Sequence, residues 1–465
     1  GCEKQINYME VGEMKRKVLL LTITILLLSF SLFGKAVELT YMYWGSPEER
    51  VAQENMLTEF EKAYQDVFPG IKVKALHVPA NYDEKIASMV AGGNPPQIAQ
   101  LVGYQACEWA EKNVVYDINS FIRNDPTFDP DDYLDTVWVY SDHGNKVAGV
   151  RLANEVMVTW YNKEIFDDNN VPYPPSDPTK WTWDLFLETA IRLTTDRNGK
   201  HPNEEGFDPS KIKTYGVMVP NEINTILPLI WSNGGDIVDE SGKVPTVTNK
   251  EVIEVIQLIS DLIHKYHVAP SSSQISGLPA SYVALQTKQV AMVLAGQWTL
   301  LDLGKMEQQG RLKLGVAPLP YIKEPIAFIL GSPNAIFTDA VKGNSDVLKA
   351  TWELYKWAID SEKVLPLIQS GLWMPLQKKW YTEPEYIEKW LTPGIHPPEY
   401  KEAVIDYVLD YGRVSSENYL INYKLVADIM YQEFELLFSG KISAEEACKN
   451  VAKKIEPYLE GRYDK

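Results

Sequence analysis

Residues 38–50, ELTYMYWGSPEER, join a β-rich run to the start of a helix. The stretch 38–44 is short, rich in aromatic residues and poor in turn formers, which is typical of a strand. Ser46 is a good N-cap residue, Pro47 suits the first helical position, and Glu49 stands three residues after the cap, as in a capping box. The stretch therefore predicts a strand that passes directly into a helix.

The same alternation continues to residue 102. Apolar residues that share one face extend the helix through Tyr64, after which residues 71–78 are typical of a strand. Residues 83–91 predict a second helix, which ends at Gly92-Gly93, and residues 98–102 predict a third strand. Strands that alternate with helices favour parallel βαβ units.

A second α/β unit follows residue 151. It comprises a strand at 156–161, a helix at 182–194, a strand at 215–219 and the apolar stretch 226–231. Ser443 and Glu446 give another capping-box pattern before a C-terminal helix. A chain of this length exceeds what one hydrophobic core usually supports, so two domains are expected.

The N-terminal region has the pattern of a secretory signal peptide. Residues 14–17 are basic after Met14, residues 18–33 are apolar, and residues 34–36 include small residues at a cleavable spacing. Residues 1–13 precede this natural-looking start and are interpreted as an upstream extension. We therefore expect residues 14–36 to be a signal peptide and the mature protein to be periplasmic or extracellular.

Charge and cysteine content exclude several classes of function. The formal net charge is -18, and loss of residues 1–36, with five basic and three acidic residues, moves it to about -20. Such a surface repels phosphate backbones, so no nucleic-acid partner is expected. Only Cys107 and Cys448 remain in the mature chain, which argues against a disulfide scaffold or a cysteine-rich metal site. No metal or cofactor is expected.

Several short motifs occur in the order found in one family. They are Tyr43-Trp44-Gly45, Phe60-Glu61-Lys62 before Pro69-Gly70-Ile71, Gly92 to Pro96, Trp160 to Phe166, Pro228 to Asp236, Ala291-Met292 before Gly296-Gln297-Trp298, and Ser439-Gly440 before Ala447. In this order the chain resembles the family 1 extracellular solute-binding proteins of ABC sugar importers, over nearly the whole mature sequence. Gln97 stands where the family usually has an Asp.

The resemblance implies a periplasmic-binding-protein fold, with two α/β lobes joined by several hinge crossings around a central cleft. The crossings are expected near Ala153, Ile326 and Pro375. The first lobe would then comprise residues 37–153 and 327–375, and the second residues 154–326 and 376–465. The implied function is capture of a carbohydrate by domain closure, by a monomer that delivers it to ABC transporter permease subunits and is not an enzyme.

Candidate ligand-binding residues come from two arguments. Sugar recognition needs flat apolar faces and fixed polar groups at the carboxyl ends of strands, where Trp44, Tyr104 and Gln105 are predicted to lie. The resemblance adds a further set by motif position: Glu155, Glu222, Asn224, Trp231, Trp298, Gly331, Ser332 and Trp373. It assigns Trp298 to stacking, with Gly296 allowing close approach of backbone to ligand. Arg413 is a further candidate because of its charge.

Three alternatives for the ligand and the activity stay open. A neutral oligosaccharide or related sugar is the first interpretation, but Arg151 and Arg413 are cations that could pair with a uronide, and a polyol is also possible. Ala427 and Tyr431 replace the aromatic and arginine of the family's maltose-binding members, so a maltodextrin is not implied. A secreted glycoside hydrolase would instead use Glu155 and Glu222 as its carboxylate pair.

Overall fold

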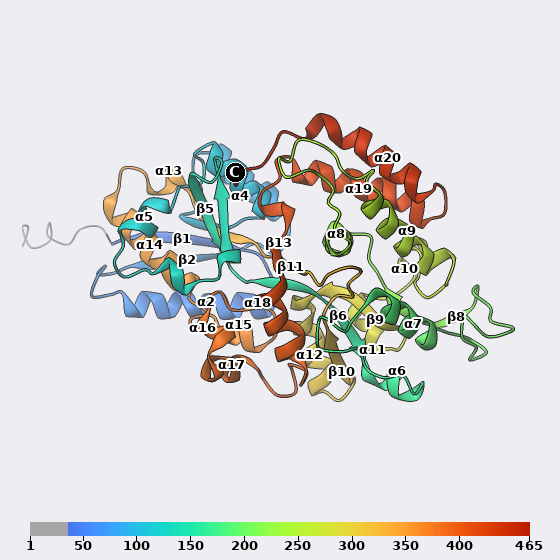
Figure 1. The fold of residues 1–465 in the computed structure, drawn as a ribbon. Coiled ribbons are helices and arrows are strands. Elements are labelled where there is room, and N and C mark those ends of the chain that lie inside the picture. Colours follow the sequence, from blue (N-terminus) through green and yellow to red (C-terminus); the bar gives the residue numbers. More distant parts are fainter. Residues whose placement is uncertain (1–35) are drawn as a thin grey trace, which may run out of the picture.

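The computed structural model describes residues 36–465, which form two mixed sheets with helices around them (Figure 1). The upstream extension at 1–13 and the expected signal peptide, except residue 36, lie outside the described residues. An α/β fold with two units is the architecture predicted from the sequence, and it is confirmed.

The first sheet has six strands in the order β2-β1-β3-β12-β5-β4. Strand β1 pairs in parallel with β2 and β3, as predicted, whereas β12, β5 and β4 join by antiparallel pairing. The strands are β1 (Glu38–Tyr43), β2 (Lys72–His77), β3 (Ile98–Gln100), β4 (Trp138–Ser141), β5 (Lys146–Arg151) and β12 (Pro333–Ile336).

Both faces of this sheet are covered, which explains the nearly continuous apolar sequence of β1. Tyr41 and Tyr43 belong to the same buried cluster as Phe60, whereas Met42 belongs to the cluster of Ala106. The helices over the sheet are α2 (Pro47–Ala63), α3 (Tyr82–Ala91), α4 (Gly103–Glu111) and α14 (Ser345–Ala358). The predicted capping box of α2 is present, with reciprocal hydrogen bonds between Ser46 and Glu49.

The second sheet has the order β13-β11-β6-β9-β8-β7, and β10 also pairs with β6. Only β8 with β9 and β11 with β13 pair in parallel; the other pairs are antiparallel. The strands are β6 (Glu155–Asn162), β7 (Thr195–Asp196), β8 (Ile212–Met218), β9 (Val290–Gly296), β10 (Leu314–Ala317), β11 (Ala327–Leu330) and β13 (Gly412–Val414).

The main helices of this half are α7 (Trp183–Leu193), α8 (Ile223–Ser232), α9 (Lys250–His264), α12 (Leu300–Gln308), α19 (Tyr423–Phe438) and α20 (Ala444–Ile455). The shorter helices of the whole described chain are α5 (Asn119–Asn124), α6 (Lys163–Asp168), α10 (Ser272–Ile275), α11 (Ser281–Gln286), α13 (Thr338–Val341), α15 (Leu365–Gln369), α16 (Lys379–Thr382), α17 (Pro384–Trp390) and α18 (Tyr407–Tyr411). In Figure 1, β1, β2 and β5 lie to one side of β11 and β13, and β8 and β9 lie to the other.

The chain passes between the sheets more than once. It leaves β5 at Arg151 and enters β6 at Glu155, then returns from β11 to β12 between Leu330 and Pro333. The return therefore lies a few residues after the expected position near Ile326. Gln377 still pairs with Tyr133 beside the first sheet, after the expected crossing near Pro375. The exact lobe boundaries remain a prediction.

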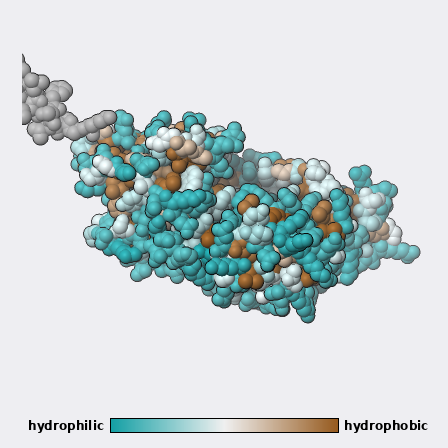
Figure 2. Space-filling model, turned by 90° about the horizontal axis from the view of Figure 1, so that it is seen from above, coloured by the Kyte–Doolittle hydropathy of each residue, from teal (hydrophilic) through white to brown (hydrophobic). Residues whose placement is uncertain are grey.

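The surface seen in Figure 2 is mainly hydrophilic, with hydrophobic residues scattered over it. Within residues 36–465 no helix combines the length and apolar character needed to cross a membrane. Cys107 and Cys448 are both free and buried.

Candidate functional site

A cavity of about 250 Å³ lies where the carboxyl ends of strands from both sheets meet. Trp44 follows β1, Gln100 ends β3, Leu152 and Ala153 follow β5, and Ser332 follows β11. The full lining is Trp44, Glu49, Gln100, Leu152, Ala153, Glu155, Trp298, Ser332, Leu372 and Trp373. Five predicted ligand residues, Trp44, Glu155, Trp298, Ser332 and Trp373, are therefore brought together here.

Three tryptophan rings provide the apolar part of the cavity. Trp44 and Trp298 are partly exposed, whereas Trp373 is buried. The rings of Trp44 and Tyr82 pack nearly perpendicular to each other, with centroids 4.8 Å apart and planes at 84°. This contact fixes the ring without covering all of it. Trp44 is thus supported by the core but is not a fully buried core residue.

Trp298 lies in a single 3₁₀ turn, Gln297–Thr299, directly after β9. Its ring lies against Gly296, where an added Cβ would stand 2.1 Å from a ring carbon. Gly296 therefore makes room for the Trp298 ring. Close approach of a ligand to the backbone of Gly296, which the resemblance implied, stays a prediction.

The polar groups of the cavity have spare hydrogen-bonding capacity. Glu155 begins β6, and its carboxylate accepts no hydrogen bond from the residues that the structure describes. The Oε1 of Gln100 accepts from the backbone N–H of Trp44 at 3.4 Å, while its Nε2 is buried and has no partner within residues 36–465. Glu49 accepts the backbone N–H of Ser46 through Oε2 at 2.7 Å.

Burial and like charge both act on Glu155. The pKa of Glu155 is raised to about 8, chiefly by burial; the charges of Glu49 and Glu417 act in the same direction and that of Arg151 in the opposite direction. Arg151 ends β5 and is completely buried, so desolvation lowers its pKa to about 10. Its three guanidinium nitrogens make no hydrogen bond within the described chain. Arg151 and these carboxyl groups therefore form a coupled set of partly desolvated titratable groups at the first crossing between the sheets.

Glu417 extends this set from the segment that follows β13. One of its carboxylate oxygens accepts the backbone N–H of Gly103 at 3.3 Å, and burial raises its pKa. The same segment contacts α4 again, because the thiol of Cys107 donates to the carbonyl of Asn418 at 3.3 Å. The two halves of the molecule therefore touch beside the cavity.

Three predicted residues of this region do not line the cavity. Tyr104 stacks on Tyr423 of α19, with ring centroids 6.0 Å apart, and Gln105 is partly exposed on α4. Gly331 has φ +138°, and an added Cβ would meet the carbonyl oxygen of Ala153 at 2.3 Å. The glycine is required by the close approach of two crossing segments.

Four predicted residues lie elsewhere in the second half. Glu222 is exposed at the start of α8, and Asn224 is in the first turn of that helix. Trp231 is 1% exposed and packs on Phe328, so it is a core residue. Arg413 stacks over Trp231 at 3.7 Å and pairs with Asp236 at 2.7 Å. The spacing of these residues in the sequence could not show which of them are buried.

Five lining residues were missed from the sequence: Glu49, Gln100, Leu152, Ala153 and Leu372. Gln100 ends the observed strand β3, but the strand predicted from the sequence ran to residue 102 and so placed Gln100 in its middle. Glu49 was assigned only to the capping box, yet the same side chain also reaches the cavity. Leu372 follows α15 and directly precedes the predicted Trp373, but no motif singled it out.

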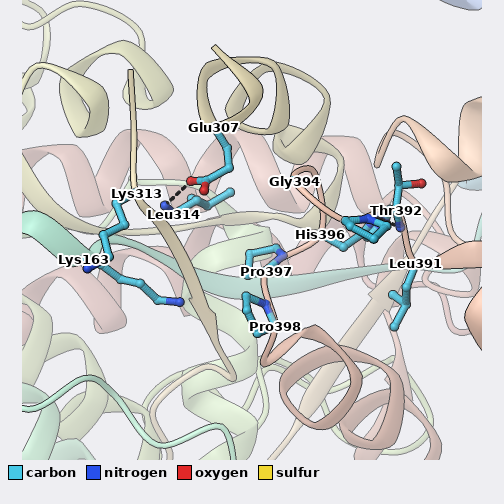
Figure 3. A pocket seen from close by; sticks show the side chains of 11 residues that line it. Lys163, Glu307, Lys313, Leu314, Leu391, Thr392, Gly394, His396, Pro397 and Pro398 are labelled. Carbon is cyan, nitrogen blue, oxygen red and sulfur yellow. Dashed lines mark hydrogen bonds between the residues drawn. The ribbon is translucent and has the colours of Figure 1, made fainter. Parts of the chain in front are cut away.

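A second cavity, of about 490 Å³, is shown in Figure 3 and contains none of the predicted residues. It lies between β10 and the loop at 391–398. The dashed line in the figure marks the hydrogen bond from the backbone N–H of Leu314 to Glu307, at 2.6 Å. Its two lysines are already paired, Lys163 with Glu399 and Lys313 with Asp167.

Comparison with known proteins gives one family and a consistent group of structures. Residues 55–394 match the family model described as "Bacterial extracellular solute-binding protein". The ABC substrate-binding protein Lmo0181 from Listeria monocytogenes, in complex with cycloalternan, is 25% identical with a TM-score of 0.73, covering 91% of this chain and 99% of that one.

Two further solved structures share the fold at lower identity. Maltose-bound MalE3 from T. maritima is 19% identical with a TM-score of 0.70, covering 91% of this chain and 100% of that one. The sugar-binding protein MalE from Xanthomonas citri is 16% identical with a TM-score of 0.71, covering 91% and 97%.

Proposed function

This chain belongs to the bacterial extracellular solute-binding protein family, and on that premise we propose that it captures a short carbohydrate in the cavity between its two sheets. The observation that carries the proposal is the convergence of three tryptophans and Glu155 on one cavity lined from both halves. The family resemblance stated from the sequence motifs is confirmed, and the chain is a solute-binding protein of the ABC transporter type and not an enzyme.

The lining suits the two chemical faces of a sugar. Tryptophan rings offer flat apolar surfaces to the C–H face of a pyranose, and the carboxylates and Gln100 offer acceptors and a donor to hydroxyl groups. The volume is below the range of about 300–1,000 Å³ typical of ligand pockets. We therefore propose one or two sugar units as the bound length.

The solved relatives are consistent with this class of ligand. The Listeria protein was solved with cycloalternan and the T. maritima protein with maltose, and both proteins share the fold of this chain. We propose that the ligand is handed to the permease subunits of an ABC transporter, and that the protein acts outside the cytoplasmic membrane after removal of residues 14–36.

The hydrolase alternative has no support in the geometry. Glu155 lines the cavity, whereas Glu222 is exposed at the start of α8 and lines no part of it. A hydrolase needs both carboxylates beside one glycosidic bond, at most about 9.5 Å apart across it. The non-catalytic family agrees with this reading.

A panel of mono- and disaccharides, polyols and uronides tests the proposal by thermal shift, followed by calorimetry on those that stabilise the protein. A ligand in excess over its Kd should raise the Tm, because it binds the native state only. Chromatography of the recovered ligand should show it unchanged. If no member of any sugar class stabilises the protein, or if the sugar is cleaved, the proposed function is wrong.

A further inference from the structure

The charged groups that line the interlobe cavity are both acidic. Glu49 reaches it from α2 and Glu155 from the start of β6, and no lysine, arginine or histidine is among the lining residues. A neutral sugar would use these carboxylates only as acceptors. A cation would in addition offset the repulsion between them.

The nearest arginine does not supply that cation. Arg151 is fully buried outside the lining, and its charge acts on Glu417 first and on Glu155 second. The other titratable neighbours are Glu417 itself and His77, which acts to lower the pKa of Glu49. Three carboxyl groups therefore share one guanidinium and one imidazole, so acidic groups outnumber basic ones beside the cavity, and a bound cation would favour the ionised form of Glu155.

The aromatic residues reinforce the same preference. A cation held near the faces of tryptophan rings is attracted by the ring quadrupole, and an aromatic cage combined with carboxylates is a common way to bind ammonium groups. Trp44, Trp298 and Trp373 all contribute to the lining. The buried Nε2 of Gln100 has no partner among residues 36–465 and adds one fixed donor for an oxygen of the ligand.

We propose that the cavity selects a short sugar that carries a protonated amino group, held by Glu49 and Glu155 among the three tryptophans. This inference rests on the proposed function and narrows it to one class of ligand. It disfavours a uronide, because a carboxylate on the ligand would face two acidic side chains with no lining cation.

The test is a matched series of sugars at pH 6.5. This pH is below the pKa of ~7.7 of an ordinary α-amino group, so an amino group on the ligand is protonated. Glucosamine, glucose and glucuronate, the corresponding galactose series, and the β-1,4 dimers of the glucose series are titrated calorimetrically. The amino form should bind at least tenfold more tightly than the neutral form of its series, and the acid form most weakly. Equal or tighter binding of the neutral or acidic form would overturn the inference while leaving the proposed function intact.

The Glu155→Gln variant locates the effect. It should reduce the preference for the amino form over the neutral form at least fivefold. The matched control is Glu240→Gln, which removes one negative charge from an exposed side chain and should leave the preference within twofold. Binding of the amino form should also release protons, measured in buffers of different ionisation enthalpy, because the ligand favours ionised Glu155. If no sugar of any charge binds, the proposed function fails and this inference fails with it.

Discussion

Glu155 shows how much a single residue can be predicted from sequence. Its place in the cavity followed from motif spacing, as did that of Trp298, because both stand immediately beside strand ends. Spacing could not reveal that Arg151, four residues earlier, is buried beside Glu155 without a hydrogen-bond partner within residues 36–465. Burial depends on what packs over a side chain, and the group whose charge acts most strongly on Arg151, Glu417, is likewise distant in sequence.

The raised pKa of Glu155 predicts a pH-dependent stability. A carboxyl group whose pKa is raised to about 8 in the folded protein favours folding below its unfolded pKa, and that contribution is lost as pH rises through 8. The Tm of the wild type minus that of Glu155→Gln should therefore fall between pH 5 and pH 9. Thermal unfolding of the unliganded proteins checks this.

Comparison with the variant separates Glu155 from its neighbours. Glu49 and Glu417 also have raised pKa values and remain in both proteins, so their contributions largely cancel. A difference in Tm that stays constant from pH 5 to pH 9 would show that Glu155 is ionised throughout, and that its environment is more polar than the structure indicates.

At the scale of elements, helices and strands with clear caps were predicted well. Residues 38–44 and the helix after Ser46 became β1 and α2, and the C-terminal cap at Ser443 begins α20. Strand direction was predicted only in part, because antiparallel β12, β5 and β4 complete the first sheet. A strand's own residues do not encode which partner it meets.

The junction between β9 and its 3₁₀ turn gives the second prediction. In Gly296→Ala, the new methyl group would overlap the ring of Trp298, so the ring must move and the stacking face is displaced. The affinity for the bound sugar should fall at least fivefold by calorimetry. Gly277→Ala, at an exposed glycine where a Cβ meets its nearest atom at 3.4 Å, is the matched control. Unchanged affinity in Gly296→Ala would show that Trp298 is not part of the binding surface.

At the scale of the whole molecule, the two sheets are linked by at least two direct crossings and by contacts at one end of the cavity. The C-terminal segment adds to them, since the backbone N–H of Tyr463 donates to Tyr419 and its carbonyl accepts from Gly144 beside β4 and β5. The sequence predicted the crossings through the family resemblance but gave no sign of this return of the C-terminus.

Multiple crossings predict rotation of two bodies about a hinge. Because the cavity is lined from both halves, a ligand that contacts both sides should stabilise a more closed arrangement. Small-angle scattering at saturating sugar should give a smaller radius of gyration than without it. Superimposable curves for a sugar whose binding is established would contradict closure but not binding.

The central claim, that a sugar is held in the cavity by the tryptophans, is tested most directly by calorimetric titration of Trp298→Ala beside the wild type, with the tightest sugar of the panel. Loss of the ring's contact should weaken binding by ~1–3 kcal/mol, judged from the burial of a large apolar side chain, which is roughly five- to 150-fold in Kd. The Tm of the unliganded variant should stay close to that of the wild type, because the ring is only partly buried. An unchanged Kd together with a clearly lowered Tm would show that Trp298 is a packing residue, and that the sugar is bound elsewhere.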